Sequence, residues 1–592
     1  MHHHHHHGGS GVRSRTRIRG AAVTAFTLVA GSATPVLGAD ATYRVVARTG
    51  QFAPGGGFFS TFGAPAITAN GRVAFRASAV GVLANRGVWS EGLSGMNNLE
   101  SVMRLGDELP GLNGTFVATA NPEFGGIILN DSGELAFNVR ITGAQAAFGD
   151  NAIVVHDANG LRSIAVPGQL VSLPCGGLGC QRWMTEVGAE FFAFNNAGEV
   201  AYTTTVAGTA INPDNEHLLM FNDGSTNEVV AREGDVPPST FGVVYSSMRG
   251  SATQLNDNGE ILMRIYLRDV NINDFYWSVW RGAPGALSIV AAENWTAPMG
   301  GEFGDGVFGN IGEMPFNNAG HAAFVQFVED NQGDNRLGVW RNNNASTQAI
   351  CFEGLPAPLG LTHRTPATFL QSMNPSGAVA FTTVVEGPGV NADNDVALIR
   401  RMPFGLQTIL AREGMQAPGL LNGVVFDDVA WSGQQILDDG RVVFRVQVSG
   451  PGVHDGNDGT LWITRDGAPP ALLLREGQSM VIGGQLKTVG AFILTLSPGS
   501  ESGRKTSVSE LGQTAIRVIF TDATEAIIVA SPESVCPGDV NNDGLVDFSD
   551  LNAMLTEFGH LGDVVDADLD LDGDVDFTDL NAVLSNFGVN CN

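Results

Sequence analysis

Asn130-Asp-Ser-Gly-Glu-Leu-Ala-Phe137 is a tight turn followed by an apolar strand, and variants of it recur about every 60 residues along the chain. Asn and Gly tolerate the positive φ angles of a tight turn, and the apolar residues after the glycine favour a strand. Further copies begin at Asn195, Asn256, Asn317 and Asn374, and weaker copies contain Gly71, Gly440 and Gly512. A fixed spacing of this kind indicates a repeat architecture.

Three other strand patterns accompany each copy in a constant order. A short apolar strand often ends in Trp-Arg, as at Trp280 and Trp340, and the next one runs into Arg-Glu-Gly, as at Arg232-Glu-Gly234. A Phe-rich segment such as Phe58-Phe59 then leads to the next turn. Aromatic and β-branched residues favour strands, and no convincing amphipathic helix interrupts them. Four strands in about 60 residues are typical of a propeller blade.

The number of copies predicts an all-β, eight-bladed β-propeller over residues 42–531. Each of the three best-defined strand types occurs eight times. The chain enters with a strand of the Arg-Glu-Gly type, at Tyr43–Arg48, and leaves without one. We therefore expect Tyr43–Arg48 to complete the last blade and close the ring, which removes both exposed edges. The alternatives are an open β-solenoid of the same units and a seven-bladed ring with an accessory sheet.

The termini and the charge predict a secreted or cell-surface protein. Residues 1–11 are a histidine tag and linker, and residues 12–41 form a candidate signal peptide with a basic start, the apolar run Ala21–Ala30 and the cleavage site Ala39-Asp-Ala41. The formal charge is −29, from 32 basic and 61 acidic residues, which argues against binding to nucleic acid or anionic membranes. No later stretch is apolar for long enough to form a transmembrane segment.

Five cysteines fit an exported protein. Cys175 and Cys180 flank a short loop, and Cys536 and Cys591 bracket the C-terminal segment, so each pair is a candidate disulfide. Cys351 lies in a strand pattern and is left without a partner. We expect it to be a small buried apolar side chain rather than a reactive thiol.

The sequence changes character in residues 532–592, where two acidic loops begin 29 residues apart. Each loop has oxygen-bearing side chains at positions 1, 3, 5, 9 and 12, a glycine at position 6 and a backbone carbonyl at position 7. Ca²⁺ takes six to eight oxygen ligands from a loop of this length. Each loop leads into a short amphipathic helix, Leu551–Phe558 and Leu580–Phe587. The expected ligands of two Ca²⁺ ions are Asp539, Asn541, Asp543, Leu545, Asp547, Asp550, Asp568, Asp570, Asp572, Asp574, Asp576 and Asp579.

These loops and helices resemble a type I dockerin over about Cys536–Cys591. The resemblance implies a small α-helical domain that holds two Ca²⁺ ions and docks to a cohesin-like or other surface receptor. It also implies that Ser549 and Thr578, at loop position 11, are partner-binding residues. Because the two halves are nearly identical, either helix face could engage the partner. The upstream repeats resemble secreted bacterial tandem-repeat proteins of the N-x-x-G-x-x-A-F type, a resemblance that implies no particular chemistry.

Loops between the first two strand types are rich in Asp and Asn, and we expect them on one face of the ring. Two interpretations remain open. In the first, the side chains form Asx-turns that satisfy backbone N–H groups; in the second, they form a ring that binds Ca²⁺ or sugar hydroxyls. The loops are 149–151, 212–216, 271–274, 330–335, 391–395 and 454–458.

A catalytic residue should stand out from the repeat. The recurring Arg-Glu pairs at Arg232 and Arg412 are therefore expected to make a repeated structural contact. No zinc-hydrolase spacing, nucleophile elbow or phosphate-binding loop occurs. The weak catalytic candidates are His363, Tyr245 and Arg249, because a polysaccharide lyase needs a base and a cation that neutralises the uronate.

These observations favour an exported binding or scaffold protein, whose propeller binds glycan or protein and whose C-terminal domain docks it to a surface or complex. The alternatives are a polysaccharide-degrading enzyme, either a lyase or a glycoside hydrolase, and a structural envelope component. An enzyme should show non-repeating His, Tyr, Arg and carboxylate side chains together in a cleft. A binding module should show equivalent positions around a ring.

Overall fold

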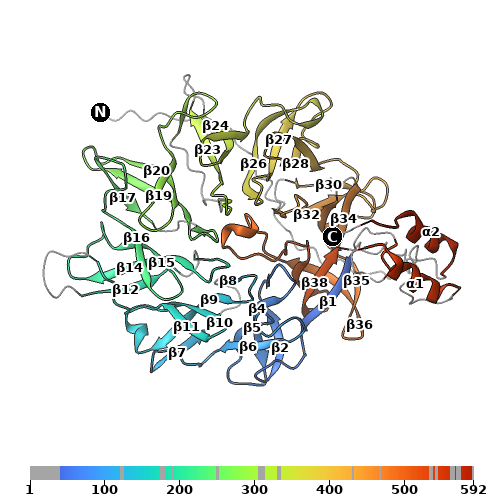
Figure 1. The fold of residues 1–592 in the computed structure, drawn as a ribbon, viewed down its shortest axis with the longest axis horizontal. Coiled ribbons are helices and arrows are strands. Elements are labelled where there is room, and N and C mark those ends of the chain that lie inside the picture. Colours follow the sequence, from blue (N-terminus) through green and yellow to red (C-terminus); the bar gives the residue numbers. More distant parts are fainter. Residues whose placement is uncertain are drawn as a thin grey trace, which may run out of the picture. The chain divides into compact units, whose positions relative to one another are not determined.

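Eight antiparallel sheets follow one another along the chain and form a ring (Figure 1). The computed structural model describes residues 41–589 apart from 120–125, 174–180, 189–191, 249–252, 305–313, 330–334, 430–432, 466–467, 533–537, 541–544, 560–566 and 568–574. The candidate signal peptide, except Ala41, and both candidate disulfides lie outside the described residues. No helix in the described part of the chain is long and apolar enough to cross a membrane.

We number the sheets as blades 1 to 8 and the main strands of each blade A to D. Blades 1 to 4 contain β2 (Phe58–Phe62), β4 (Val73–Val80), β5 (Arg86–Ser90) and β6 (Glu100–Arg104); β7 (Thr115–Thr119), β9 (Leu135–Gly143), β10 (Asn151–Asp157) and β11 (Gly160–Ala165); β12 (Arg182–Val187), β14 (Val200–Gly208), β15 (His217–Asn222) and β16 (Asn227–Arg232); and β17 (Val243–Ser247), β19 (Ile261–Asp269), β20 (Phe275–Gly282) and β21 (Ser288–Ala292).

Blades 5 to 8 repeat this order. They contain β22 (Glu302–Phe303), β23 (Ala322–Glu329), β24 (Asn335–Asn342) and β25 (Thr347–Cys351); β26 (Thr362–Met373), β27 (Val379–Glu386), β28 (Val396–Arg401) and β29 (Gln407–Arg412); β30 (Val425–Asp427), β32 (Val442–Ser449), β33 (Gly459–Arg465) and β34 (Ala468–Arg475); and β36 (Gln485–Ile493), β37 (Thr514–Phe520), β38 (Glu525–Pro532) and β1 (Ala41–Arg48), with β35 (Ser479–Ile482) beside β36.

Short elements complete the described part. Five blades have a short inner strand paired with the start of strand B: β3 (Ala66–Ile67), β8 (Ile127–Leu129), β13 (Ala193–Phe194), β18 (Gln254–Leu255) and β31 (Gln434–Ile436). The 3₁₀ turns are η1 (Gln145–Ala147), η2 (Pro358–Gly360) and η4 (Ser500–Ser502), and the C-terminal helices are α1 (Phe548–Glu557) and α2 (Phe577–Ser585).

The N-terminal strand closes the ring, as predicted. Strand β1 pairs antiparallel with β38, with Tyr43 opposite Ala530. It also joins the neighbouring blades: the Tyr43 hydroxyl donates to the Leu473 carbonyl of blade 7 at 2.7 Å, and Arg44 forms an ion pair with Glu91 of blade 1 at 2.7 Å. The eight-bladed ring is thereby confirmed, and neither the open solenoid nor the seven-bladed ring is observed.

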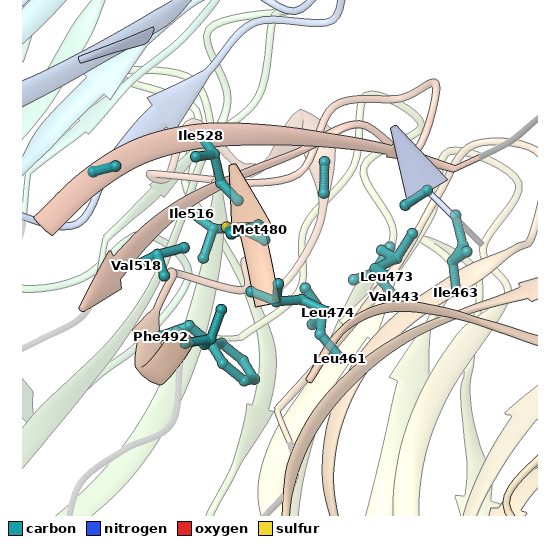
Figure 2. Packing of buried hydrophobic residues seen from close by; sticks show 14 of the residues in the cluster. Val443, Leu461, Ile463, Leu473, Leu474, Met480, Phe492, Ile516, Val518 and Ile528 are labelled. Atoms are coloured by element: carbon teal, nitrogen blue, oxygen red, sulfur yellow. The ribbon is translucent and has the colours of Figure 1, made fainter. Parts of the chain in front are cut away.

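Apolar side chains pack between the faces of adjacent blades and form the core. Figure 2 shows this contact for blades 7 and 8, where Leu461 and Leu474 lie near Met480, Phe492 and Ile516. Within a blade, a buried Trp on strand C packs edge-on against an aromatic ring on strand A. The ring centroids are 5.1 Å apart for Trp89–Phe59, 5.6 Å for Trp280–Tyr245, 5.3 Å for Trp340–Phe303 and 5.4 Å for Trp462–Phe426. These pairs explain why the Trp and Phe patterns recur.

A segment between β36 and β37 fills the middle of the ring, which the repeat pattern did not predict. We call residues 494–513 the channel segment; Figure 1 shows it crossing the centre. The Pro498 carbonyl accepts from the Met373 amide of blade 6 at 2.8 Å, and the Gly503 carbonyl accepts from Phe194 of blade 3 at 2.8 Å. The Thr506 carbonyl accepts from Ile67 of blade 1 at 3.1 Å. One segment therefore ties together blades on different sides of the channel.

Candidate functional site at the mouth of the central channel

The first Asn of the repeated turn joins each blade to the next. Within blade 4, the Asn256 side-chain oxygen accepts from the Glu260 amide at 2.9 Å, and Gly259 has the positive φ of 73° that closes the turn. Its side-chain nitrogen donates to the Asn317 carbonyl of blade 5 at 3.1 Å. The same bond runs from Asn130 to Asn195, from Asn195 to Asn256, from Asn317 to Asn374 and from Asn374 to Leu437.

Asn256→Ala is expected to destabilise the protein by about 2–4 kcal/mol. The substitution removes the bond between blades and leaves buried backbone groups of Glu260 and Asn317 without their partner. Denaturant melts of the wild type and the variant measure the loss. Asn159→Ala, at an exposed turn, is the control and should change stability by less than about 0.5 kcal/mol. Equal effects of the two substitutions would contradict this role of Asn256.

The residue after that Asn forms a second ring, at one end of the channel. The backbone amide of Asp131 donates to the Asn196 side chain at 2.9 Å, Asn196 to Asp257 at 2.8 Å and Asp257 to Asn318 at 2.7 Å. Glu501 of the channel segment accepts from the Asn318 amide at 2.8 Å. Asp438 and Glu510 occupy the corresponding positions of blades 7 and 8. We call Asp131, Asn196, Asp257, Asn318, Asp438 and Glu510 the channel-mouth ring.

Burial and neighbouring carboxylates raise the pKa of Asp438 and Glu510 in this ring and of Glu501 in the channel segment. Burial, then the charges of Asp438 and Asp131, raise the pKa of Glu510 to about 7. Burial also raises the pKa of Asp438, which is hydrogen-bonded to Glu510. The pKa of Glu501 is raised by burial and by Asp438 and Asp257. At neutral pH, Glu510 therefore exists partly as the acid, and the mouth offers both donors and acceptors.

Stability is expected to fall as the pH rises from about 4.5 to about 7 because of Glu510. Its folded pKa of about 7 exceeds the ordinary 4.5, so the folded state keeps a proton that the unfolded chain has lost. Glu510→Gln should therefore gain roughly 1–2 kcal/mol on the wild type between about pH 5 and about pH 7.5. Thermal melts at both pH values test this, with the exposed Glu228→Gln as control. A wild-type-to-variant difference that is the same at both pH values would contradict the assignment.

The depression inside the ring is small. It is lined by side chains that include Asp131, Asn196, Asp257, Arg504 and Glu510, and its volume is about 40 Å³. A space of this size holds one or two waters. A sugar chain is too large for this depression and must therefore contact the rim.

The Asp/Asn-rich loops lie at the opposite end of strand B from the channel-mouth ring. In the loop of blade 3, the Asn212 side chain accepts from the Asp214 amide and the Asn215 side chain accepts from the Asn212 amide, both at 2.9 Å. The loop of blade 6 has the same bonds, from Asp393 to Asn391 and from Asn391 to Asn394, both at 2.8 Å. These are Asx-turns, the first of the two interpretations. The loop of blade 5 falls partly outside the described residues.

The Arg-Glu pairs make the repeated structural contact that was expected of them. Each arginine donates through Nε to the carbonyl of the loop Asn: Arg232 to Asn215 at 3.1 Å, Arg412 to Asn394 at 2.6 Å and Arg475 to Asn457 at 2.7 Å. Each glutamate accepts from the first backbone amide of strand C, as Glu413 does from Val396 at 3.3 Å. Burial of the Glu413 carboxyl raises its pKa to about 7. These pairs fasten the loops to the outer strands.

The weak catalytic candidates do not form a site in the described residues. Tyr245 and His363 occupy the strand A position that Phe59 occupies in blade 1; they lie opposite Leu267 and Val385 as Phe59 lies opposite Ala79. Tyr245 is 3% exposed and His363 is 0% exposed, and burial raises the pKa of the Tyr245 phenol. Aligning the strand A segments would have assigned both residues to the core. Arg249 lies outside the described residues.

A buried polar chain surrounds His363. Its Nδ1 lies 3.3 Å from the Thr383 hydroxyl, which also lies 3.3 Å from the Cys351 sulfur. Its Nε2 lies 2.9 Å from the side chain of Gln407. Gln407 lines a surface depression of about 540 Å³ with Met299, Leu355 and Arg401 among others, but His363 does not. Cys351 is fully buried, as expected, and burial raises the pKa of its thiol to about 12.

The C-terminal segment is built from two equivalent halves. Each helix starts with a buried Asp whose carboxylate accepts from the backbone amide three residues before it: Asp550 from Asp547 at 2.9 Å and Asp579 from Asp576 at 2.8 Å. The halves then bind each other reciprocally. Gly588 donates to the Val546 carbonyl at 2.7 Å and Gly559 to the Val575 carbonyl at 2.8 Å, and the rings of Phe548 and Phe587 and of Phe558 and Phe577 pack edge-on.

Only part of each predicted calcium loop lies in the described residues. Asp539, Leu545, Asp547, Asp550, Asp576 and Asp579 are described, whereas Asn541, Asp543, Asp568, Asp570, Asp572 and Asp574 are not. Among the described residues, no group of three or more His, Cys, Asp or Glu side chains is placed to hold a metal ion. Asp550 and Asp579 are 0% exposed and Asp539 is 6% exposed, a burial of carboxylates that a bound cation would offset. Ser549 is exposed, and the side chain of Thr578 is not described.

The fold and the channel mouth define an eight-bladed β-propeller protein. The chain belongs to the family described as "Family of unknown function (DUF7453)", which matches residues 30–178, 181–358 and 299–536. No curated protein matches the chain.

Solved structures match the chain only distantly. The β-propeller domain of the Trilobed protease from Pyrococcus furiosus is 11% identical, with a TM-score of 0.35, and the match covers 71% of this chain and 99% of that one. An oligogalacturonate lyase in complex with manganese is 12% identical, with a TM-score of 0.31 and coverage of 67% and 86%. A PL25 ulvan lyase is 10% identical, with a TM-score of 0.28 and coverage of 72% and 96%. At these values the structures carry no argument about function.

Proposed function

We propose that this protein is an exported binding protein whose channel-mouth ring holds a hydroxyl-rich, neutral glycan. The observation that carries the proposal is the ring itself, in which Asp131, Asn196, Asp257 and Asn318 present carboxylate and amide groups from four successive blades. A binding module is expected to use equivalent positions around a ring, and the described candidates for a catalytic cleft are buried in separate blades.

The chemistry of the ring matches sugar hydroxyls. A side-chain amide both donates and accepts hydrogen bonds, and a carboxylate accepts several, so together they pair with groups that do both. The formal charge of −29 disfavours a polyanionic ligand at this acidic mouth. A depression of about 40 Å³ favours an extended chain that lies across the rim over a single sugar enclosed in a pocket.

Retention on immobilised polysaccharides tests this proposal. Neutral glucans, mannans and galactans should retain the wild-type protein more strongly than polygalacturonate does. The double substitution Asp131→Ala and Asp257→Ala should lower retention at least about tenfold, a loss of roughly 1.4 kcal/mol. The control is Asp214→Ala with Asp393→Ala, in the Asx-turn loops at the other end of strand B, and parallel melts check folding. Equal retention of both double variants would overturn the proposal.

A second candidate function, glycoside hydrolysis, is favoured by one observation. Asp438 and Glu510 are hydrogen-bonded carboxyls, and the pKa of Glu510 is raised to about 7. A protonated acid beside a carboxylate is the pair that glycoside hydrolysis uses. If the protein is a hydrolase, new reducing ends should appear on a retained polysaccharide, and Glu510→Gln should abolish them. Absence of new reducing ends on every retained polysaccharide would exclude this candidate.

The C-terminal segment is proposed to be a Ca²⁺-dependent, dockerin-like module that attaches the protein to a cohesin-like or other surface receptor. What supports this is the duplicated arrangement of buried carboxylates at Asp550 and Asp579. The halves also expose equivalent apolar side chains: Phe548 and Phe577 are 75% and 76% exposed, and Leu555 and Leu584 are 55% and 53% exposed. Paired exposed side chains of this kind suit a partner that binds either half.

Asp543→Ala combined with Asp572→Ala is expected to abolish calcium-induced ordering of this module. Each substitution removes a carboxylate ligand from one loop, while the propeller, which has its own core, should keep its β-sheet circular dichroism. Calorimetric titration with Ca²⁺ measures the change, with loss of both tight sites in the double variant and of one site in each single variant. Two tight Ca²⁺ sites remaining in the double variant would show the loop assignment to be wrong.

A further inference from the structure

Two cations, Lys505 and Arg76, lie near each other inside the ring. Lys505 of the channel segment donates to the Ala64 carbonyl of blade 1 at 2.8 Å. The adjacent residue, Gly63, donates its backbone amide to the carbonyl of Arg76 at 2.7 Å, which places Arg76 beside that contact. Arg76 is 3% exposed. Both residues thus lie on the blade 1 side of the channel.

The hydrogen-bonding capacity of this pair is only partly used. The Arg76 guanidinium donates through Nη2 to the Asn138 side chain at 2.9 Å, to the Asn138 carbonyl and to the Gly126 carbonyl at 3.4 Å, and its Nε has no partner among the described residues. Lys505 has three N–H groups, and within the described part of the chain one bond, to Ala64, is seen. The Arg504 guanidinium donates to the Phe192 carbonyl nearby at 2.7 Å.

No carboxylate among the described residues offsets these charges. The electrostatic neighbour of Lys505 is Arg76, a like charge, and the burial of Arg76 has no acidic counterpart. Buried charges in proteins are normally paired, because an unpaired one costs several kcal/mol. The lack of an acidic partner for Arg76 and Lys505 is unexpected in a chain with 61 acidic and 32 basic residues. Lys505 as a whole residue is half-buried.

We infer that Arg76 and Lys505 form a binding site for a small oxyanion inside the channel. The oxyanion would accept from the free Nε–H of Arg76 and from the unused N–H groups of Lys505, and it would supply the missing negative charge. A free phosphate or sulfate and the carboxylate of a sugar acid share this chemistry. The site is separate from the channel-mouth ring and does not rest on the glycan proposal.

Binding at this site is linked to the protonation of Lys505. Burial, and then the charge of Arg76, lower the pKa of Lys505 to about 7. An oxyanion prefers the ammonium to the neutral amine, so it raises that pKa, and its affinity falls as the pH rises above about 7. Once the anion is bound, Arg76 and the anion are the charged groups that affect the pKa of Lys505, because no acidic residue of the described elements affects it.

The lysine content of the chain makes the test direct. Lys487 and Lys505 are the two lysines in the sequence, and Lys487 forms an exposed ion pair with Asp522. In the full-length protein labelled at the lysine ε-carbon, nuclear magnetic resonance should show two lysine signals, the first of which, from Lys505, titrates near pH 7. Inorganic phosphate, added against sodium chloride of equal ionic strength, should raise the midpoint of the first signal by about one pH unit for a tenfold preference of the anion for the ammonium. The Lys487 midpoint should stay unchanged.

Variants separate the site from general salt effects. Phosphate at about pH 7 should raise the melting temperature of the wild type and of Lys487→Met but not that of Lys505→Met or Arg76→Met. Lys505→Arg, which keeps the positive charge, should retain the effect and lose its decline above pH 7. Glucuronate in place of phosphate tells which source of oxyanion fits better. An unshifted Lys505 midpoint, or an equal phosphate effect in Lys505→Met and the wild type, would overturn the inference.

Discussion

A chain that lacks Tyr43–Arg48 is expected to melt about 5–10 °C below the intact protein and to self-associate. Three losses add up. Strand β38 loses its partner and becomes an exposed edge. The core between blades 8 and 1 loses Val46 and Ala47, which are 8% and 0% exposed. The carboxylate of Glu91, which is 1% exposed, loses its bidentate partner Arg44.

The last of these losses can be measured alone. Arg44→Met keeps the strand and its apolar contacts but leaves Glu91 buried without a cation, which should cost about 2–4 kcal/mol. A synthetic peptide of residues 42–49, added in excess to the shortened chain, should bind β38 and restore much of the melting temperature. Removal of the tag, residues 1–11, is the control and should leave the melt unchanged. An unaltered melt after removal of Tyr43–Arg48 would refute closure by the N-terminal strand.

Gly503→Ala is expected to destabilise the protein by about 3–4 kcal/mol, because the channel segment passes close to the backbone of two blades. Gly503 has a φ of 63°, and a Cβ at this position would lie 2.5 Å from the Leu255 carbonyl oxygen and 3.3 Å from that of Phe194. Neither backbone oxygen can move away as a flexible side chain would. The variant must therefore shift the segment and weaken the Phe194–Gly503 hydrogen bond.

Gly484→Ala is the matched control in the same blade. Gly484 has a φ of 80°, but a Cβ there meets no atom within 4 Å, so the substitution should cost only about 1 kcal/mol. The difference between the two variants in a denaturant melt isolates the clash from the cost of the left-handed backbone. The Gly503 variant should also bring the pKa of Glu510 closer to its ordinary value, because the segment carries both residues. Equal destabilisation by the two variants would contradict a seated channel segment.

The architecture of the ring could be predicted because short sequence patterns encode it and recur once in each blade. The turn at Asn130-Asp-Ser-Gly133, the Trp of strand C and the Phe of strand A each encode a short-range preference, and their recurrence gave the number of blades. Tyr245 and His363, the candidates for catalysis, occupy the same strand A position as that Phe. Polar atoms on Tyr and His suggested chemistry, whereas their shared position with Phe59 shows that they fill the core.

Other predictions lie in residues that the structure does not describe or bear on properties that it does not test. The signal peptide, the pairing of Cys175 with Cys180 and of Cys536 with Cys591, and the two Ca²⁺ sites remain predictions. Of the expected calcium ligands, Asp550 and Asp579 are described, and they are buried at the starts of α1 and α2. The Ca²⁺ titration of the variant with Asp543→Ala and Asp572→Ala tests whether the two loops bind calcium.

The sequence by itself determined the blade, the number of blades and the strand that closes the ring, because these depend on periodicity and on turn chemistry within about 60 residues. Only the tertiary structure decided what lies at the centre. Residues 494–508 show no repeat, and their partners, such as Phe194 and Ile67, are hundreds of residues away in the chain. The raised pKa of Glu510 and the buried pair of Arg76 and Lys505 likewise arise from charges that closure of the ring brings together. Such contacts leave no local pattern, since each is made once and between distant segments.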